Sequence, residues 1–243
     1  MNINIYDVSK KAGVSIATVS RVLNGNTRVS EKTRAKVINA MKELDYTPNV
    51  FARGLGLNTM KTIGIMCIDS SDIYLANAVY YLEQELRKYN YDSILCCTGK
   101  DYNNKKNYLE LLLSKRVDGI ILAGSQFVEN TSKHNNDYII NAAKDVPIVL
   151  VNGYLDADNI YSVMCNDEEA VYNATKLLIN NSHRNIVYLY TSTSYSGMNK
   201  YRGYLKAINE AGITLPDEFH HLCGKNISHA RDYLTYLYDK GMK

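Results

Sequence analysis

The chain has 243 residues, of which 46% are hydrophobic and 22% charged, and its formal net charge is +3 at pH 7. This composition can fill a hydrophobic core, which argues against bulk disorder. The sequence holds no run of about 18 apolar residues, so no membrane span is expected. The N-terminus lacks the apolar segment of a secretory signal, and the five cysteines form no CxxC pair. We therefore expect a reducing, cytoplasmic location, with cysteines that fill core space.

Basic residues are concentrated near the N-terminus. Residues 1–60 hold nine Lys or Arg and four Asp or Glu, a net charge of +5, whereas the rest of the chain holds 19 basic and 21 acidic residues, a net charge of −2. A basic head on a near-neutral body favours contact with a polyanion. Charge alone is equally compatible with a solvated helical surface.

Three helices are predicted in this head. Apolar residues recur at i, i+3 and i+7 from Ile5, which indicates a first helix, and Gly13 suits its exit. Ser15 and Ser30 occupy the N-cap positions of a second and a third helix. A short fourth helix is predicted from Pro48, but two glycines weaken it by about 1 kcal/mol each relative to Ala, so it is marginal without a partner.

From residue 61 onward, strands and helices alternate. Strands are predicted over 62–68, 91–97, 117–124, 146–152, 161–166, 185–191 and 219–224, and helices over 74–89, 103–115, 133–143, 167–181, 198–212 and 226–240. This alternation predicts an α/β fold of doubly wound parallel sheets with helices on both faces. Ligands in such sheets bind beyond the carboxyl ends of the strands, here 68–72, 98–101, 123–126, 152–154 and 191–194.

The first two helices, joined by a glycine-containing turn, form a predicted helix-turn-helix, whose second helix enters the major groove of DNA. In "SIATVSR", Arg21 can bind guanine O6 and N7 in bidentate fashion, while Ile16 and Ala17 can touch a thymine methyl group. An ordinary three-helix bundle is the alternative. Side chains that can donate to phosphates are Ser15, Thr18, Ser20, Asn24 and Thr33.

The stretches "IYDVSKKAGVS", "TVSRVLNG", "TRAKVINAMKELDYTPN" and "ARGL" resemble, in this order, the LacI/GalR family of bacterial repressors. "DGIIL", "VPIVLVN" and "KYRGYLKAINEAGI" extend the resemblance along the chain, and "SRVLNGN" with "ARGL" is most similar to the catabolite control branch. The resemblance implies a repressor of carbohydrate or catabolite-related genes that binds palindromic operator DNA as a homodimer.

It also implies a division of the chain. A helix-turn-helix DNA-binding domain spans 1–47, a hinge helix and linker 48–60, an N-terminal core subdomain 61–159 and a partial C-terminal core subdomain 160–243. The core is periplasmic-binding-protein-like. Family chains continue further, so the resemblance implies a shortened second subdomain with an exposed apolar sheet edge.

The resemblance further implies which residues meet DNA. In the family, the hinge helix folds on the operator and a leucine, here Leu55, wedges into the minor groove. The full set expected at DNA is Tyr6, Ser15, Ile16, Ala17, Thr18, Ser20, Arg21, Asn24, Arg28, Thr33, Tyr46, Asn49, Ala52 and Leu55.

The implied effector cleft departs from the family pattern. Lys200 replaces the usual Arg, and Asn152 and Asn166 replace two Asp residues, so an ammonium and two amides stand where the family has a guanidinium and two carboxylates. A small sugar-type effector is slightly favoured, and a phosphorylated carrier protein acting as corepressor is the alternative. The residues expected at the effector are Asp69, Ser125, Asn152, Asn166 and Lys200.

Other chemistry has little support. No GxxxxGK[ST] loop, paired carboxylates or Ser-His-Asp set is visible, so neither an enzyme nor a cofactor is predicted. His220, His221, Cys223 and His229 could suggest zinc, but adjacent histidines on a strand face opposite ways, which favours a surface cluster. The competing function is a sugar-binding or sugar-processing α/β protein with an incidental helical head.

Overall fold

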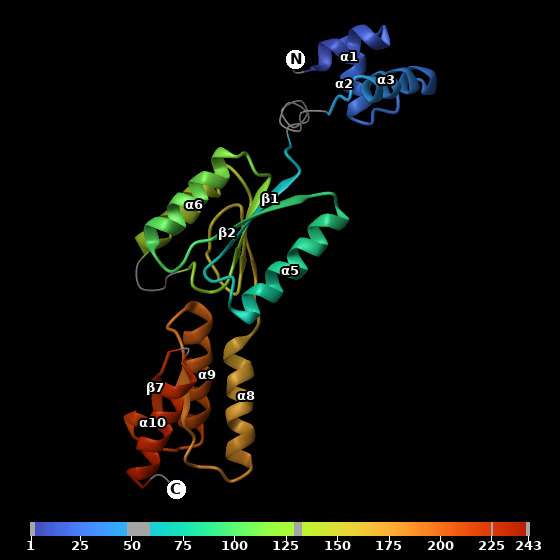
Figure 1. The fold of residues 1–243 in the computed structure, drawn as a ribbon. Coiled ribbons are helices and arrows are strands. Elements are labelled where there is room, and N and C mark those ends of the chain that lie inside the picture. The colour runs from blue at the N-terminus through green and yellow to red at the C-terminus, as the bar shows by residue number, and fades with distance from the viewer. Residues whose placement is uncertain (1–2, 48–58, 129–132, 225, 242–243) are drawn as a thin grey trace.

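The computed structural model describes residues 3–47, 59–128, 133–224 and 226–241 (Figure 1). The predicted hinge helix and the expected DNA contacts at Asn49, Ala52 and Leu55 lie outside these ranges. Within them, none of the helices is long and apolar enough to cross a membrane.

Three helices form the head, as predicted: α1 (Ile5–Ala12), α2 (Ile16–Leu23) and α3 (Glu31–Glu43). Ser15 and Ser30 cap α2 and α3, and α1 leaves through Gly13 in the left-handed region at φ 65°. Helices of this length are marginal alone, so their stability depends on packing around a small shared apolar core. Its buried members are Val8, Val19, Val22, Val37 and Ala40.

The first core unit (residues 59–163) is a five-stranded sheet with every strand pair parallel. Its strands are β1 (Thr62–Cys67), β2 (Asp92–Cys97), β3 (Gly119–Ala123), β4 (Ile148–Val151) and β5 (Ile160–Val163), in the order β2-β1-β3-β4-β5. Its helices are α5 (Ile73–Lys88), α6 (Tyr102–Ser114), the 3-10 turn η1 (Lys133–Asn136) and α7 (Asp137–Ala142). Figure 1 shows α5 and α6 on opposite sides of the sheet, so the predicted doubly wound arrangement is confirmed.

The carboxyl ends of β1 and β3 flank the point where the strand order reverses. Strands buried on both faces explain the near-continuous apolar runs of the sequence. Met66, Leu112, Leu122, Ile139 and Leu150 lie in the core of this unit, each 1% exposed or less. The strands that flank the reversal point therefore belong to a well-packed core. The loops that follow β1 and β3 are the places where a ligand is expected.

Strand β5 corrects one predicted boundary. It pairs with β4 in the first sheet, with Ile148 opposite Ile160, although residues 160–243 were expected to form the second subdomain. Ile160 also packs against the first core, which holds the strand in that sheet. The chain thus leaves the first unit only after Val163.

The second core unit (residues 167–241) holds two parallel strands in its described part, β6 (Tyr188–Tyr190) and β7 (His220–Leu222). Its helices are α8 (Asp167–Asn180), α9 (Tyr195–Glu210), the 3-10 turn η2 (Asp217–Phe219) and α10 (Ile227–Asp239). Leu222 of β7 is 48% exposed.

Two details of this unit depend on short-range contacts. Helix α9 begins three residues before its predicted start, because the Ser194 side chain caps it by accepting a bond from the Gly197 amide at 3.3 Å. Helices α8 and α9 lie side by side (Figure 1), and Gly203 makes this possible. A Cβ at that position would lie 2.1 Å from the Glu168 carbonyl oxygen.

Candidate nucleic-acid interface and ligand cleft

Helix α2 divides its residues between the core and solvent. Val19 is fully buried and Val22 is 7% exposed, whereas Ile16 is 37% exposed and Ala17 and Arg21 are also exposed. Alternation at helical spacing turns the valines inward, so the expected base-contacting side chains share the outer surface. Tyr6, at the start of α1, is 66% exposed.

Several of the expected phosphate donors also hold the head together. Ser15 Oγ accepts a bond from the Thr18 amide at 3.2 Å and lies 2.9 Å from Thr18 Oγ1. Ser30 and Thr33 repeat this pattern at 3.3 and 2.9 Å. These hydroxyls therefore fix the first turns of α2 and α3, and each remains at least partly exposed.

The other expected contacts lie at the borders of the helices. Asn24 is the C-cap of α2, half-buried Ser20 lies on the same helix, and Tyr46 packs against the head core. Arg28 is exposed in the loop between α2 and α3, where its amide donates to Asn26 Oδ1 at 2.9 Å. The structure thus brings the described DNA candidates onto one small body.

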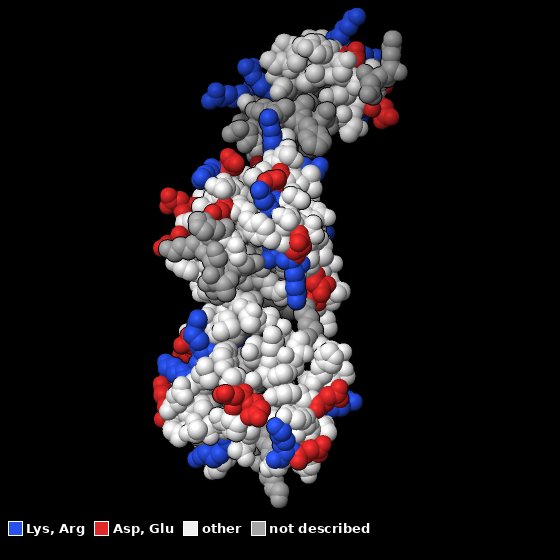
Figure 2. Space-filling model, turned by 90° about the vertical axis from the view of Figure 1, so that its left-hand side faces the viewer, with Lys and Arg blue, Asp and Glu red and all other residues white. Residues whose placement is uncertain are grey.

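Positive charge remains available on the head. On the face shown in Figure 2, Lys and Arg side chains project from it. Lys11 pairs with Glu43 at 2.9 Å, and Arg34 lies 3.7 Å from Glu31. The Arg21 side chain is exposed, and no ion pair or hydrogen bond joins its guanidinium to another described residue, so the guanidinium is open to a ligand.

A second candidate site lies where the two core units meet. Asp69, Ser125 and Asn152 follow β1, β3 and β4 at the carboxyl ends of the first sheet. Ser125 Oγ donates to Ser194 Oγ of the second unit at 2.9 Å. Lys200 of α9 lines the same small hollow as Ser125, so residues from both units converge there.

Lys200 is partly neutralised. Its Nζ lies 3.7 Å from Asp167 Oδ1, and Ser196 Oγ donates to the other oxygen of that carboxylate at 2.5 Å. The hollow is therefore lined by several hydroxyl groups and by the Lys200 ammonium, whose charge Asp167 partly balances.

Asn152 reaches a residue that the sequence did not single out. It takes the left-handed conformation at φ 59°, which Asn tolerates better than most residues, and its Nδ2 donates to the Tyr74 hydroxyl at 2.6 Å. Burial raises the pKa of Tyr74, and the nearby Cys165 and Asp167 raise it further. Tyr74 thus lies close to the start of the second unit while belonging to α5.

A larger cleft of about 1060 Å³ adjoins this hollow and shares Thr191, Ser192 and Ser194 with it. Its walls come from both units, and they also include Lys100, Lys105, Gln126 and Arg202. Lys105 is only 3% exposed, and its Nζ donates to the Gln126 carbonyl oxygen at 2.8 Å. A cleft of this size with hydroxyl, amide and cationic groups suits a small polar ligand.

Two expected effector residues point elsewhere. Asn166 caps α8: its Oδ1 accepts from the Glu169 amide at 3.2 Å and its Nδ2 donates to Glu169 Oε2 at 2.6 Å. It lines a separate hollow with Tyr172 and Lys206. Asp69 Oδ1 accepts two bonds from Ser71 within its own loop. Asp167, not Asn166, is the residue of this segment that meets Lys200.

Sequence reasoning missed Tyr74, Ser194 and Lys105. A signal existed for Ser194, because it stands in the "TSTS" run at a predicted strand end and before a helix, where an N-cap is common. Lys105 and Tyr74 lie on helices, and the periodicity of a helix does not tell which polar residue will face another part of the chain.

The histidine cluster does not form a metal centre. His220 contacts Tyr201 of α9 at 5.3 Å between ring centroids, and His221 stacks on Tyr233 of α10 at 3.8 Å. The two rings thus face different helices. Across the described ranges, no group of three or more His, Cys, Asp or Glu side chains could hold a metal ion.

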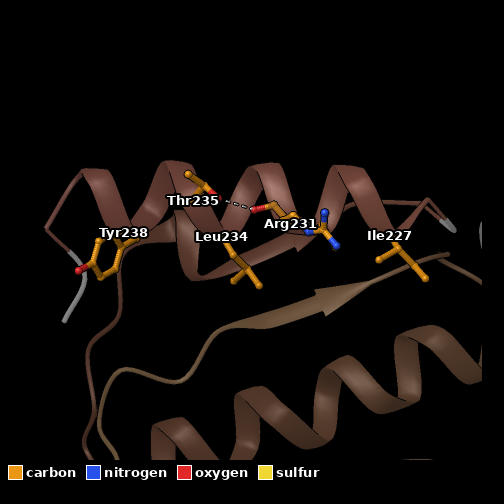
Figure 3. A pocket seen from close by; sticks show the side chains of 6 residues that line it. Ile227, Arg231, Leu234, Thr235 and Tyr238 are labelled. Carbon is orange, nitrogen blue, oxygen red and sulfur yellow. Dashed lines mark hydrogen bonds between the residues drawn. The ribbon is translucent and has the colours of Figure 1, made fainter.

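Helix α10 carries a separate apolar groove (Figure 3). Ile227, Leu234 and Tyr238 line it and are 78%, 40% and 71% exposed. The groove is lined entirely by residues of α10 and shares none with the cleft.

Two family models match the chain. One, described as bacterial regulatory proteins of the lacI family, matches residues 4–49, and the other, described as periplasmic binding proteins and sugar binding domain of the LacI family, matches residues 60–241. Together they span nearly all of the chain on either side of residues 50–59.

Similar proteins are transcriptional regulators. An HTH-type transcriptional regulator of Lachnoclostridium phytofermentans is 57% identical over 98% of this chain and 72% of its own length. Catabolite control protein A of Priestia megaterium is 34% identical over 90% of this chain, which spans 65% of that relative. A crystal structure of the lac repressor dimer bound to operator and an anti-inducer shares the fold, with a TM-score of 0.83 and 22% identity over 100% of this chain and 72% of that one.

Proposed function

The chain belongs to the LacI family of bacterial regulatory proteins, and we propose that it is a sequence-specific DNA-binding repressor controlled by a small molecule in the cleft between its core units. Arg21 is proposed to select a base pair, with Ile16 and Ala17 touching bases beside it. Tyr6, Arg28 and the capping hydroxyls of the head are proposed to hold phosphates.

The observation that carries this proposal is the outer face of α2. A helix of eight residues keeps two valines in the head core and leaves Arg21, Ile16 and Ala17 exposed, with a capped first turn. A head that served only as a solvated bundle would have no need for an exposed apolar pair beside an unengaged arginine. Such a surface matches the mixed edge of a major groove, where methyl groups and acceptors alternate.

The effector is proposed to be a sugar-type molecule. Ser125, which follows β3, and Lys200 of α9 supply a hydroxyl and an ammonium to one hollow, and the amide of Asn152 follows β4 at the same edge of the sheet. Because Asp167 lies close to Lys200, the local charge is balanced, which suits a neutral polyol better than a free anion. Asp69 and Asn166 are proposed to act only after their present hydrogen bonds are exchanged.

A phosphorylated carrier protein is the second candidate effector. Lys200 and the similarity to catabolite control protein A favour it, since the chain is 34% identical to that relative. Titration calorimetry with a panel of neutral sugars, sugar phosphates and a phosphocarrier protein separates the candidates. Binding of a neutral sugar that is weakened by Asn152→Ala supports the cleft proposal, and binding of the carrier protein alone contradicts it.

Selection of bound duplexes from random DNA, with the purified chain at fixed salt, tests the DNA-binding proposal. A homodimer is proposed to present two heads to two half-sites, so the expected motif is a near-palindrome. Recovery of sequences with no shared motif would contradict sequence-specific binding. Recovery of a single half-site without symmetry would contradict the dimer while leaving the role of α2 intact.

A further inference from the structure

Two cysteines occupy the same level of neighbouring strands. Cys67 ends β1, Cys97 ends β2, and the two are register partners in the parallel pair. The backbone pairing continues past them, since the Thr98 amide donates to the Cys67 carbonyl oxygen at 2.9 Å and the Gly99 amide to the Ile68 carbonyl oxygen at 3.0 Å. Backbone hydrogen bonds therefore hold the two strand ends side by side.

Register partners in a parallel sheet send their side chains to the same face. Adjacent strands lie about 4.8 Å apart, which falls within the Cα separation of about 4.4–6.8 Å that a disulfide needs. The two thiols interact directly, and Cys97 Sγ also donates to the Ile68 carbonyl oxygen at 3.5 Å. The expected Cα spacing of the two positions is therefore compatible with a disulfide.

The pair is asymmetric. Cys67 is completely buried, whereas Cys97 is exposed at the edge strand β2. Burial, with Cys97 beside it, raises the pKa of the Cys67 thiol to about 11. Cys97 can therefore meet a reagent from solvent, while Cys67 can meet only what is already attached to Cys97.

We propose that Cys67 and Cys97 form a dithiol modification site that a low-molecular-weight disulfide converts into an intrachain disulfide. The Cys97 thiolate attacks one sulfur of the reagent RSSR, the reagent's S–S bond breaks, and one RS⁻ leaves and takes up a proton. Cys67 Sγ then attacks Cys97 Sγ, the bond between Cys97 and the attached RS group breaks, and the departing RS⁻ takes up the proton that Cys67 gives up. Two thiols are oxidised, and RSSR is reduced to two RSH.

The other three cysteines lack this arrangement. Cys96 points to the opposite face of β2 and is paired with Met66. Cys165 is exposed after β5, and Cys223 Sγ lies 3.7 Å from the Tyr190 carbonyl oxygen in the second unit. None of them faces another cysteine across a strand pair, and the exposed one, Cys165, is the natural control for simple surface oxidation.

The bond would tie together two loops, one of which borders the cleft. Residues 68–72 follow Cys67 and residues 98–101 follow Cys97, and Lys100 of the second loop lines the cleft. The inference itself rests on the sheet register and does not require that the cleft bind an effector.

The test uses the full, fully reduced chain, folded and incubated with oxidised glutathione, followed by intact mass and peptide mapping. Wild type should lose two hydrogen atoms and yield one linked pair of peptides containing Cys67 and Cys97. Cys67→Ala should instead accumulate one glutathione on Cys97, and Cys97→Ser should give neither product. Cys165→Ser should behave like wild type.

Three outcomes overturn the inference. They are a wild-type chain that keeps glutathione on Cys97 at the end point, a linked pair that involves another cysteine, and a chain that remains fully reduced. Because the wild-type map decides among these by itself, the inference stays testable even if the substitution at buried Cys67 prevents folding. A circular dichroism spectrum of each variant identifies that case.

Discussion

At the scale of single residues, the head separates side chains that build it from side chains that it offers. Ser15, Thr18, Ser30 and Thr33 spend hydrogen-bonding capacity on helix caps, whereas Arg21 is left open on the outer face of α2. Capping hydroxyls can still reach phosphates, but they are poorly placed to select bases. Sequence preference should therefore depend on Arg21 more than on the hydroxyl residues.

Replacement of Arg21 tests that distinction. Arg21→Ala should weaken binding to a selected duplex by about 1–3 kcal/mol and relax the preference at one base pair per half-site. Arg21→Lys is the matched control, because it keeps the charge but loses the bidentate fork. It should retain weak nonspecific binding and still lose the base preference. An unchanged motif in both variants, measured by repeated DNA selection, would show that another residue selects the base.

Tyr204 gives a residue-scale prediction for stability. It is 2% exposed, and its hydroxyl donates to the Ile186 carbonyl oxygen at 2.9 Å. Tyr204→Phe leaves that acceptor without its partner and should cost about 1–2 kcal/mol at neutral pH. Urea unfolding measures the loss. Tyr238→Phe is the control, because Tyr238 is 71% exposed and its loss should change stability little.

The contact between Tyr204 and Ile186 also predicts how the stability of the chain changes with pH. Burial raises the pKa of Tyr204 to about 12 from an ordinary value of 10.0. Below pH 10 the hydroxyl is protonated in both folded and unfolded chains. As the pH rises from 10 to 12, the unfolded state ionises first, so wild type should lose stability that Tyr204→Phe does not lose, up to about 3 kcal/mol. A stability gap that stays constant over this range would contradict the assignment.

At the scale of elements, the second core unit depends on a close helix pair. Helices α8 and α9 approach each other at Gly203, where a Cβ would lie 2.1 Å from the Glu168 carbonyl oxygen and 2.9 Å from the Tyr172 amide nitrogen. Both neighbours are backbone atoms, so the space cannot be recovered by turning a side chain. The helices must separate if this position gains a methyl group.

Gly203→Ala should therefore destabilise the chain by about 1–3 kcal/mol, despite the better helix propensity of Ala. Asn209→Ala on the exposed side of α9 is the matched control, and it should change stability by about 0.5 kcal/mol or less. Denaturant midpoints compare the two. Equal midpoints for Gly203→Ala and wild type would mean that the helices are not held at this distance.

The order of the elements followed from the sequence, because apolar strands and amphipathic helices alternate clearly from residue 62 onward. Two features of the fold could not be predicted from the sequence. The start of α9 depends on the Ser194 cap, and the pairing of β5 depends on its contact with β4, neither of which periodicity records. The same limit applies to the cleft. The family pattern pointed to Asn152 and Lys200, whereas Tyr74 is placed beside Asn152 by a hydrogen bond between residues far apart in the chain.

At the scale of the whole molecule, charge and chemistry are divided. Residues 1–60 carry a net charge of +5, and the remainder carries −2. The polar cleft lies between the two core units, apart from this charge. The division keeps the proposed DNA-binding surface of the head apart from the proposed ligand cleft of the core.

The charge of the head predicts a strong dependence of DNA binding on salt. If each head neutralises about five phosphates, the logarithm of the binding constant should fall with the logarithm of salt concentration at a slope of about −4 to −5 per head. Fluorescence anisotropy at several potassium chloride concentrations and one pH gives the slope. A nearly flat response would exclude the head as the polyanion-binding part.

We propose above that α2 gives the chain a preference for particular DNA sequences. One competition titration tests it most directly: a labelled duplex carrying the selected motif is displaced by either the same duplex or a scrambled one of equal length and composition, at fixed salt. The selected duplex should compete at least about 10³-fold better than the scrambled duplex. Equal competition by the two duplexes would indicate only nonspecific attraction to a polyanion and would contradict sequence-specific binding through α2.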